Sequence, residues 1–349
     1  MAEMMKALAK TSPTEGLDLI EAAIPTPGPE DVLIRVHRTA VCGTDIHIWN
    51  WDEWSQKNVP MPMITGHEFA GEIVAVGSAI DRPLKIGQRV SAEGHVINLN
   101  SEAARAGHFH LDPATRGIGV NRQGAFAEFV AVPAFNVIEL ADEVPYEIGA
   151  LLDPFGNAVH TAQQFDLLGE DVLVTGAGPI GIMAAAVARH AGARTVVLTD
   201  INDYRLDLAQ KVAPGVRTVN TTREDLHDVI HELGMKVGFD VALEMSGSPI
   251  AFRQCVDTLI MGGGMAMLGI PSKPMETDWG AIILKALTIK GVYGREMFTT
   301  WRKMLGLLKA GLDLQPLITH RLPFDQYRDG FAAMKSGQSG KVILNWDKV

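Results

Sequence analysis

The feature that most constrains this 349-residue chain is a glycine-rich turn, TGAGPIG, which ends at Gly181. It follows the strand-like run DVLVT and opens the helix-like run IGIMAAAVARHAG. Gly176, Gly178 and Gly181 form a G-x-G-x-x-G pattern, in which the first glycine permits a tight turn and the second lets the backbone approach a pyrophosphate. The third lets helix and strand pack closely. The turn therefore predicts a dinucleotide site at the N-terminus of that helix.

The residues after this turn alternate between strand-like and helix-like runs. Strand patterns at 195–200, 239–245, 264–270 and 287–293 are separated by helical patterns at 203–212, 222–233 and 249–260. Such alternation implies a parallel sheet with right-handed crossovers.

A single acidic residue indicates which dinucleotide this sheet would bind. Asp200 ends the strand after the glycine turn, nineteen residues beyond Gly181. A carboxylate there can accept both ribose hydroxyl groups and would repel a 2′-phosphate, which favours NAD over NADP. The neighbouring Arg205 could stack on or pair near the adenosine, and as a cation it weakens the preference for NAD slightly.

The first 150 or so residues have a different pattern of residue types. Runs at 31–41, 68–78 and 126–134 mix β-branched and aromatic residues with Gly and Pro, which predicts a mostly antiparallel, barrel-like domain. After residue 296 we expect a helix over 297–311 and a strand over 341–346, the latter returning to the first domain. The chain is thus predicted to be α/β, with one domain made of 1–154 and 297–349 and a nucleotide-binding domain over 155–296.

Charge and composition exclude several function classes. The chain has 31 Lys and Arg against 41 Asp and Glu, a formal net charge of -10, which argues against a nucleic-acid surface. No apolar run is long enough to cross a bilayer, and the first residues lack an apolar signal core. Cys42 and Cys255 are too few for a disulfide framework; they could form one bridge, but the reducing cytoplasm is the simpler expectation.

Three separated segments carry potential metal ligands. One contains Cys42, the next contains His67 and Glu68, and the third contains Asp153. Thiolate, imidazole and carboxylate together suit Zn²⁺ in a site that keeps one position open. Taken alone, Cys42 would more often be a buried apolar residue, as free cysteines are, and Asp153 could simply cap the helix that begins near Pro154.

These motifs together resemble the zinc-dependent medium-chain dehydrogenases over essentially the whole chain. The resemblance is carried by CGTD at 42–45, GHE at 66–68 and the glycine turn. It implies a GroES-like β-barrel catalytic domain plus a Rossmann domain with a doubly wound parallel sheet. It also implies one catalytic zinc on Cys42, His67 and Glu68, with water, substrate or Asp153 at the fourth position.

The same resemblance suggests a reaction and a set of contacts. Within the family, WNWDEW and YGREMF resemble the branch that passes hydride from the β-hydroxyl carbon of L-threonine to NAD, giving 2-amino-3-oxobutanoate. Thr44 and His47 would relay the hydroxyl proton. The predicted cofactor contacts are Gly176, Gly178, Ile180, Gly181, Asp200, Arg205, Leu268, Gly269, Ile270, Val292 and Tyr293. The predicted substrate contacts are His95, Trp51, Arg295 and Glu296, although His95, Arg295 and Glu296 could instead be structural.

Two alternatives remain at this point. A polyol or secondary-alcohol dehydrogenase of the same family would use the same zinc and NAD without amino-acid contacts. A non-catalytic relative would bind NAD and serve a structural role. The resemblance also implies a homotetramer.

The stretch GHVINLNSEAARAGHFHLD, residues 94–112, departs from the family pattern. This branch of the family usually binds a structural zinc here through four cysteines. When this stretch is aligned with the family pattern, the four cysteine positions are occupied by Asn98, Ser101, Ala104 and Asp112. We therefore predict that the structural zinc is absent. A short helix capped by Ser101 could organise the lobe instead. The alternative is a rebuilt metal site on His108, His110 and Asp112.

Overall fold

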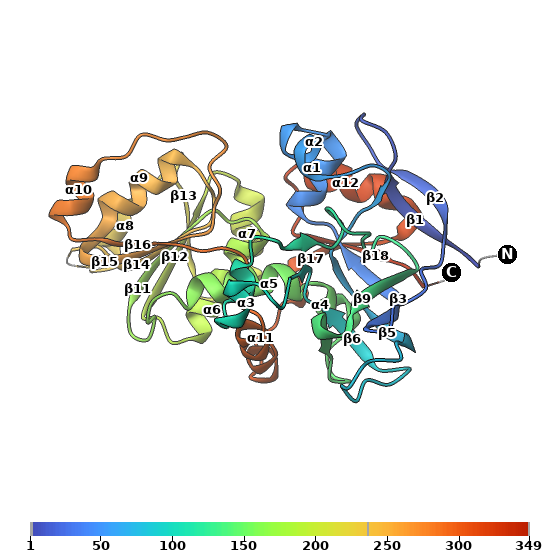
Figure 1. Cartoon of the computed structure of the whole chain (residues 1–349). Helices are drawn as coiled ribbons and strands as arrows, with labels where there is room; N and C mark the ends of the chain where they lie inside the picture. Colours follow the sequence, from blue (N-terminus) through green and yellow to red (C-terminus); the bar gives the residue numbers. More distant parts are fainter. Residues whose placement is uncertain (1–2, 236, 348–349) are drawn as a thin grey trace. The chain divides into compact units, whose positions relative to one another are not determined.

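The computed structural model describes residues 3–235 and 237–347 and divides the chain into two compact units (Figure 1). Unit 1 consists of Met1–Asp153, Ile318–Ser336 and Lys341–Val349. Unit 2 consists of Pro154–Leu317 and Gly337–Gly340. The chain therefore leaves its first unit, builds the second, and then returns.

Unit 1 is built around the long strand β3 (Asp31–Ala40), which pairs antiparallel with β5 (Glu68–Val76), β9 (Phe129–Pro133) and β18 (Lys341–Asn345). The larger sheet runs β10-β6-β5-β3-β18-β17, and a smaller one runs β2-β1-β4. The three predicted strand runs of the first domain and the returning tail strand are confirmed. The other strands are β1 (Met4–Lys10), β2 (Asp18–Ala23), β4 (Met63–Ile64), β6 (Arg89–Ala92), β7 (His95–Val96), β8 (Arg116–Gly117), β10 (Val137–Glu139) and β17 (Ile318–Pro323).

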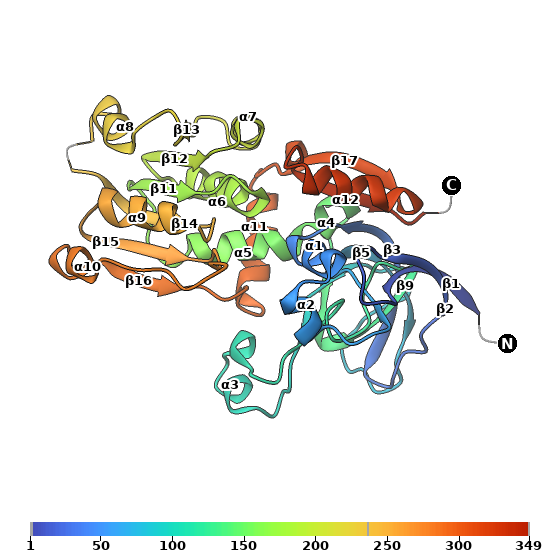
Figure 2. The same cartoon turned by 90° about the horizontal axis from the view of Figure 1, so that it is seen from above.

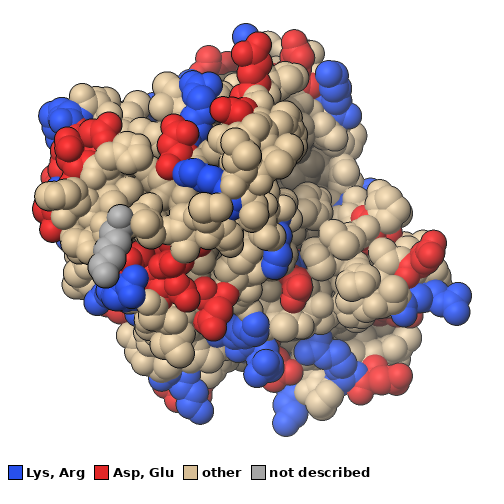
Figure 3. All heavy atoms as spheres, turned by 90° about the vertical axis from the view of Figure 1, so that its left-hand side faces the viewer, with Lys and Arg blue, Asp and Glu red and all other residues tan. Residues whose placement is uncertain are grey.

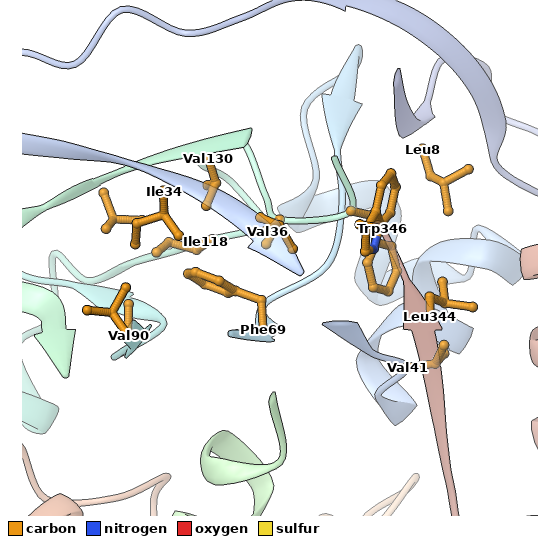
Figure 4. Packing of buried hydrophobic residues seen from close by; sticks show 14 of the residues in the cluster. Leu8, Ile34, Val36, Val41, Phe69, Val90, Ile118, Val130, Leu344 and Trp346 are labelled. Atoms are coloured by element: carbon orange, nitrogen blue, oxygen red, sulfur yellow. The ribbon is translucent and has the colours of Figure 1, made fainter. Parts of the chain in front are cut away.

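Alternating apolar residues fix the register of these strands. Val32, Ile34 and Val36 of β3 are buried and belong to one core with Phe69 of β5. Figure 4 shows Ile34, Val36 and Phe69 in this core. Fully burying one such side chain contributes about 1.5–3 kcal/mol, and slipping the register by one residue would expose the whole row. The resulting register sets Ala40 opposite Glu68, which brings the segment after β3 beside the start of β5.

Short helices join the strands of unit 1. Figure 2 shows that α3 and its connections extend away from the barrel strands, where the sequence predicted the lobe. The predicted helix in the lobe is confirmed, with Ser101 as its N-cap. The helices of unit 1 are α1 (Gly43–Asn50), α2 (Glu53–Asn58), α3 (Glu102–Arg105), η1 (Phe109–Leu111), η2 (Ala134–Asn136), α4 (Tyr146–Ala150), η4 (Phe324–Gln326) and α12 (Tyr327–Lys335).

Unit 2 contains the predicted doubly wound parallel sheet, in the order β13-β12-β11-β14-β15-β16. Figure 1 shows α8, α9 and α10 on one face of it and α6 on the other. Its strands are β11 (Asp171–Thr175), β12 (Thr195–Asp200), β13 (Arg217–Asn220), β14 (Phe239–Glu244), β15 (Leu259–Met267) and β16 (Thr288–Gly291). Its helices are α6 (Pro179–His190), α7 (Asp203–Val212), α8 (Leu226–Glu232), α9 (Pro249–Thr258), α10 (Trp279–Leu284), α11 (Thr299–Lys309) and η3 (Gln315–Leu317), while α5 (Leu152–Ala162) spans the boundary between the units.

The structure divides the chain differently from the predicted boundary at residue 297. The helix α11 belongs to unit 2, and the return to unit 1 begins at Ile318. The reason lies in the packing of α11. Trp301 is buried, and the Arg295 guanidinium lies over it, 5.5 Å from the centroid of its ring. Met304 is buried beside Gly156. The outermost residues of the predicted first domain, 1–2 and 348–349, lie outside the described residues.

Two surface properties bear on the excluded function classes. Within the described residues, no helix combines the length and apolarity needed to cross a membrane. On the face shown in Figure 3, acidic and basic side chains are scattered among broad uncharged areas. The mixture of signs on this face differs from the continuous basic surface that a nucleic acid requires.

Candidate functional site

The predicted metal ligands come together in unit 1, at the end of β3 and the start of β5. Cys42 is the N-cap of α1, and His67 and Glu68 open β5. One ligand atom from each of the three residues lies within 4.8 Å of the others. The preceding Gly66 has a φ of +84°, and a Cβ there would lie 2.3 Å from the ring of Phe126, so only glycine lets the chain bring His67 into this position.

A buried aspartate supports this cluster. Asp45 lies in the first turn of α1, where its Oδ2 accepts a 2.9 Å hydrogen bond from the Cys42 amide. Its Oδ1 lies 3.9 Å from Nδ1 of His67. Asp45 Oδ1, His67 Nδ1 and Glu68 Oε1 are all buried without a hydrogen-bond partner. A buried polar atom without a hydrogen-bond partner destabilises the folded protein. A cation bound in this pocket would give the carboxylate oxygen of Glu68 a partner.

The electrostatics of the pocket also suit a cation. Burial raises the pKa of Asp45 and of Glu68. Burial alone would lower the pKa of His67, but the negative charges of Cys42, Asp45 and Asp153 outweigh it, and the pKa of His67 is raised well above its usual value. Asp153 acts on both His67 and Glu68 through its charge. A thiolate, an imidazole and a carboxylate surrounded by further acids fit Zn²⁺.

The two predicted relay residues lie on α1, directly after Cys42. Thr44 Oγ1 is 3.8 Å from the sulfur of Cys42. His47 lies in the last turn of α1, and its Nδ1 is 2.5 Å from Oδ2 of Asp52. The other oxygen of Asp52 caps α2 by accepting from the Ser55 amide at 2.9 Å. Sequence reasoning missed Asp52, although an acid five residues after a candidate relay histidine is a signal that could have found it.

Two of the predicted substrate residues also lie in unit 1. Trp51 ends α1 in a left-handed conformation, with a φ of 54°, and the ammonium group of Lys10 lies 5.1 Å from its ring. His95 opens β7, and its Nδ1 is 2.8 Å from Oε1 of the fully buried Glu93. Glu93 was also missed, because a glutamate in a Gly-flanked segment gives no sign of burial.

The other two predicted substrate residues, Arg295 and Glu296, lie in unit 2 and differ in their exposure to solvent. Arg295 is only 1 % exposed and its guanidinium lies over Trp301, which favours the structural alternative left open above. The carboxylate of Glu296 is half-exposed and lies 3.9 Å from Nε2 of His160.

In the lobe, the four residues that stand where the family has cysteines form one hydrogen-bonded cluster. Asp112 is buried, with Oδ2 accepting from the Asn98 amide at 2.6 Å and Oδ1 accepting from the Ala114 amide at 3.1 Å. The Ser101 hydroxyl caps α3 by accepting from the Ala104 amide at 3.2 Å. The Asn98 amide, followed by Ala114 and the Ser101 hydroxyl, holds the pKa of Asp112 below its usual value. Among the described residues, no cluster of possible metal ligands combines His108, His110 and Asp112.

The glycine turn in unit 2 has the geometry that its pattern predicts. Gly176 has a φ of +90°, and a Cβ on Gly181 would lie 1.8 Å from the carbonyl oxygen of Gly176. Gly178 is the N-cap of α6 and faces open space, with Pro179 and Ile180 in the first turn. Free N–H groups and the positive end of the helix dipole are therefore available to an anion at this point.

Asp200 lies at the end of β12, beside the glycine turn. Its Oδ2 accepts from the Ala177 amide at 2.7 Å, and its Oδ1 accepts from the amides of Ile201 and Asn202. The carboxylate thus connects the glycine turn to the start of α7. Arg205 lies in the first turn of α7, and its Nε is buried without a hydrogen-bond partner.

The remaining predicted cofactor residues follow the carboxyl ends of β15 and β16. The amides of Leu268 and Gly269 donate to the carbonyl oxygen of Glu244, and Val292 donates to that of Met267. Ile270 and Tyr293 are largely exposed. The buried Glu244, which sequence reasoning missed, accepts from Ser246 and Gly247 and so fixes the loop after β14.

Comparisons with known proteins agree with this geometry. A model of the alcohol dehydrogenase GroES-like domain matches residues 28–142, and a zinc-binding dehydrogenase model matches residues 179–310. The chain is 65% identical to an L-threonine 3-dehydrogenase from Ruegeria pomeroyi, over 98% of this chain and 100% of that protein. It is 57% identical to an L-threonine 3-dehydrogenase from Shewanella woodyi, with the same coverage.

Solved structures with a similar fold include two dehydrogenases. One is a zinc-binding dehydrogenase from Sinorhizobium meliloti 1021 bound to NADP, with a TM-score of 0.90, 27% identity, and coverage of 98% of this chain and 99% of that one. The other is 2R,3R-butanediol dehydrogenase from Bacillus subtilis, with a TM-score of 0.88, 26% identity and the same coverage.

Proposed function

This chain belongs to the zinc-binding alcohol dehydrogenase family, and from that premise we propose that it oxidises the β-hydroxyl of L-threonine to 2-amino-3-oxobutanoate with NAD as acceptor. One observation carries the choice of substrate, namely the full-length 65% identity to the Ruegeria pomeroyi L-threonine 3-dehydrogenase. The coarser statement, that the chain is an enzyme that oxidises an alcohol group, follows from the family itself.

Cys42, His67 and Glu68 would hold the zinc, and Asp153 would act on it through its charge or as a further ligand. When bound, zinc supplies Lewis acidity at the substrate hydroxyl, and the nicotinamide supplies the hydride acceptor. The protein's own part is to bring the three ligands together at one point and to leave one metal position open.

The hydroxyl proton would leave through α1. Thr44 lies next to Cys42 and can both accept and donate a proton, and His47 is one helical turn further on. Asp52 fixes Nδ1 of His47, so that Nε2 is the atom that accepts the proton. This proposal gives Asp52 a positioning role in the relay.

The cofactor is proposed to be NAD rather than NADP. The glycine turn at the N-terminus of α6 would bind the pyrophosphate. Asp200 beside that turn would accept the ribose hydroxyls, and its negative charge would repel a 2′-phosphate. A structural relative is bound to NADP, so NAD specificity rests on Asp200 in this chain.

Two residues of unit 1 are the better candidates for substrate contacts. Trp51 and His95 both lie on the catalytic unit, and His95 is oriented by the buried Glu93. Glu296 remains a candidate for the ammonium group, whereas the burial of Arg295 against the ring of Trp301 favours a bracing role.

We further propose a single zinc per chain. The lobe positions Asn98, Ser101, Ala104 and Asp112 offer one carboxylate and no thiolate, and that carboxylate already accepts two backbone amides. This set does not fit a structural zinc. Hydrogen bonds to Asp112 take over the organising role that a metal would otherwise have.

A homotetramer is the proposed assembly, and the exposed edge of the unit 2 sheet supports it. The edge strand β16 is flanked by the largely exposed apolar residues Trp279, Ile283 and Leu284 of α10. Exposed apolar groups beside an unpaired strand edge favour association with another copy. Light scattering would measure the assembly, and a monomer at micromolar concentration would contradict this part of the proposal.

The proposal is tested by NADH formation with L-threonine, with zinc measured per chain on the same sample. We expect activity on L-threonine that exceeds activity on butane-2,3-diol or sorbitol, and a preference for NAD over NADP. The 2R,3R-butanediol dehydrogenase of similar fold makes a secondary-alcohol dehydrogenase the second candidate. Turnover of the diol without turnover of threonine would select it. A metal-replete protein with no activity on any of these alcohols would leave the non-catalytic alternative.

A further inference from the structure

A buried lysine lies next to the metal ligands and has no role in the proposal above. Lys341 is the first residue of β18, and its side chain is 3 % exposed. Its ammonium group donates to Oε2 of Glu68, whose side chain is fully buried, and to the carbonyl oxygen of Val41 at 3.0 Å. A charged pair removed from water to this extent is retained at a substantial desolvation cost, so a function is worth seeking.

Three chain segments make this contact possible. In the barrel sheet β3 lies between β5 and β18, and Ala40 at the end of β3 is paired with both Glu68 and Ile343. The Val41 amide also donates to the carbonyl oxygen of Val342. The last strand of the chain therefore delivers Lys341 to the point where β3 ends, Cys42 follows and Glu68 begins β5.

The two oxygens of Glu68 have different environments. Oε2 accepts from Lys341, whereas Oε1 is buried without a hydrogen-bond partner. Glu68 also belongs to the cluster with Cys42 and His67 in which the ligand atoms lie within 4.8 Å. Only Oε1 is thus available to a metal ion while the ion pair is intact.

We infer that Lys341 is a positioning residue of the metal site, which occupies one oxygen of Glu68 and restricts this ligand to a single-oxygen contact with the metal. The inference rests on the proposed zinc site. The ammonium group also draws negative charge from the carboxylate and repels a nearby dication. Lys341 therefore weakens the hold of Glu68 on the metal and keeps the metal strongly electrophilic.

Removal of the ammonium group gives a prediction of definite sign. In Lys341→Met, both oxygens of Glu68 become available, and the repulsion between the ammonium group and the dication disappears. Zinc should therefore pass to a chelator more slowly, by about ten- to a hundredfold, which is the typical size of effects from residues that support metal ligands. In the cobalt-substituted protein, the visible bands should weaken, because cobalt with five ligands absorbs less than cobalt with four.

The chain offers a matched control in Lys10. This lysine is 1 % exposed in the same unit, and its ammonium group donates to backbone carbonyl oxygens, including that of Gly16 at 3.0 Å. Lys10→Met removes an equally buried ammonium group without freeing a carboxylate. Its zinc release and cobalt spectrum should match the parent protein, even where its thermal stability falls.

A second background separates the effect of Glu68 from a general loosening of β18. Glu68→Gln offers one carbonyl oxygen in place of two carboxylate oxygens. In the Glu68→Gln protein, Lys341→Met should therefore leave the cobalt spectrum unchanged and should slow zinc release much less than in the parent protein, because only the repulsion between the ammonium group and the dication is lost. Should Lys341→Met fail to fold, Lys341→Leu serves the same purpose, because leucine is uncharged and has no hydrogen-bond donor.

The outcomes are distinct. Slower release and weaker cobalt bands that depend on Glu68 support the inference. Release or spectra that are unchanged, or faster release of zinc, overturn it. A parent protein that binds no more zinc or cobalt than Cys42→Ser does would instead refute the proposed zinc site itself.

Discussion

The metal pocket and the lobe treat their buried polar atoms in opposite ways. In the pocket, Asp45 Oδ1, His67 Nδ1 and Glu68 Oε1 are buried without a hydrogen-bond partner. In the lobe, both oxygens of Asp112 accept backbone amides. Because an unpaired buried polar atom destabilises a fold and a paired one does not, the pocket needs a ligand and the lobe does not. The comparison teaches that hydrogen-bond satisfaction separates the pocket, where we propose a metal, from the lobe, where we propose none.

The largest expected effect comes from breaking the pocket. Cys42→Ser should remove most of the zinc and lower activity by a factor of about a thousand or more, since metal polarisation of a hydroxyl contributes several kcal/mol to catalysis. Cys255→Ala is the matched control, because it removes the other thiol of the chain, from a buried position in unit 2. Elemental analysis and NADH formation measure both variants. Full zinc content in Cys42→Ser would show that the metal lies elsewhere.

The second-largest expected effect is a gain of zinc when the lobe is converted into a metal site. Replacing Asn98, Ser101, Ala104 and Asp112 with cysteine should raise the zinc content from about one to about two per chain, because hydrogen bonds already join these positions. The control replaces Asn98, Ala104 and Asp112 with serine, so that all four positions are serine. This variant should keep one zinc. A cysteine variant that keeps one zinc and exposes its thiols to modification would show that the lobe has lost the geometry of a zinc site.

Sequence patterns anticipated much of this molecule. The predicted helix 203–212 matches α7 (Asp203–Val212) and the predicted strand 195–200 matches β12, because a period of 3.6 or a buried β-branched run is set by local residues. The three proposed metal ligands could be selected from the sequence because each residue type is itself a metal ligand, and the structure brings their ligand atoms within 4.8 Å of one another. The charged residues that support them could not be selected in this way. Lys341 begins a strand, where a lysine ordinarily faces solvent, and only the three-dimensional pairing of β18 with β3 buries it.

The same limit explains the misplaced domain boundary. The apolar pattern of α11 was visible in the sequence, but its partner was not. Trp301 packs on Arg295, which the sequence offered as a substrate contact, and the absence of a side chain on Gly156 leaves the space that Arg295 occupies. Such tertiary contacts between distant residues leave no periodic signal in the sequence.

A smaller effect should follow from removing the charge of Asp112. In Asp112→Asn, the Asn98 and Ala114 amides lose an ionised acceptor, so hydrogen exchange at both amides should become several-fold faster. Ser101→Ala removes the helix cap and the hydroxyl contact to Asp112 but leaves both amide bonds to the carboxylate, so it should loosen mainly α3, by about 1 kcal/mol. Unchanged exchange at Asn98 and Ala114 in Asp112→Asn would mean that packing, and not the carboxylate, holds the lobe together.

The smallest effect is a pH dependence confined to the lobe. The Asn98 and Ala114 amides keep the pKa of Asp112 below its usual value in the folded protein. A carboxyl group with a lowered pKa stabilises the fold above its unfolded pKa of about 3.9, and this contribution is lost as the pH falls through the lower, folded pKa. Hydrogen exchange at Asn98, corrected for the intrinsic rate, should therefore accelerate below about pH 4 in the parent protein. In Asp112→Asn it should be fast throughout and lack this step. His108, His110 and Glu102 are also ionisable groups of the lobe, and all three are present in both proteins. A step of equal size in both proteins would therefore show that a group other than Asp112 causes the pH dependence, and would contradict the organising role proposed for Asp112.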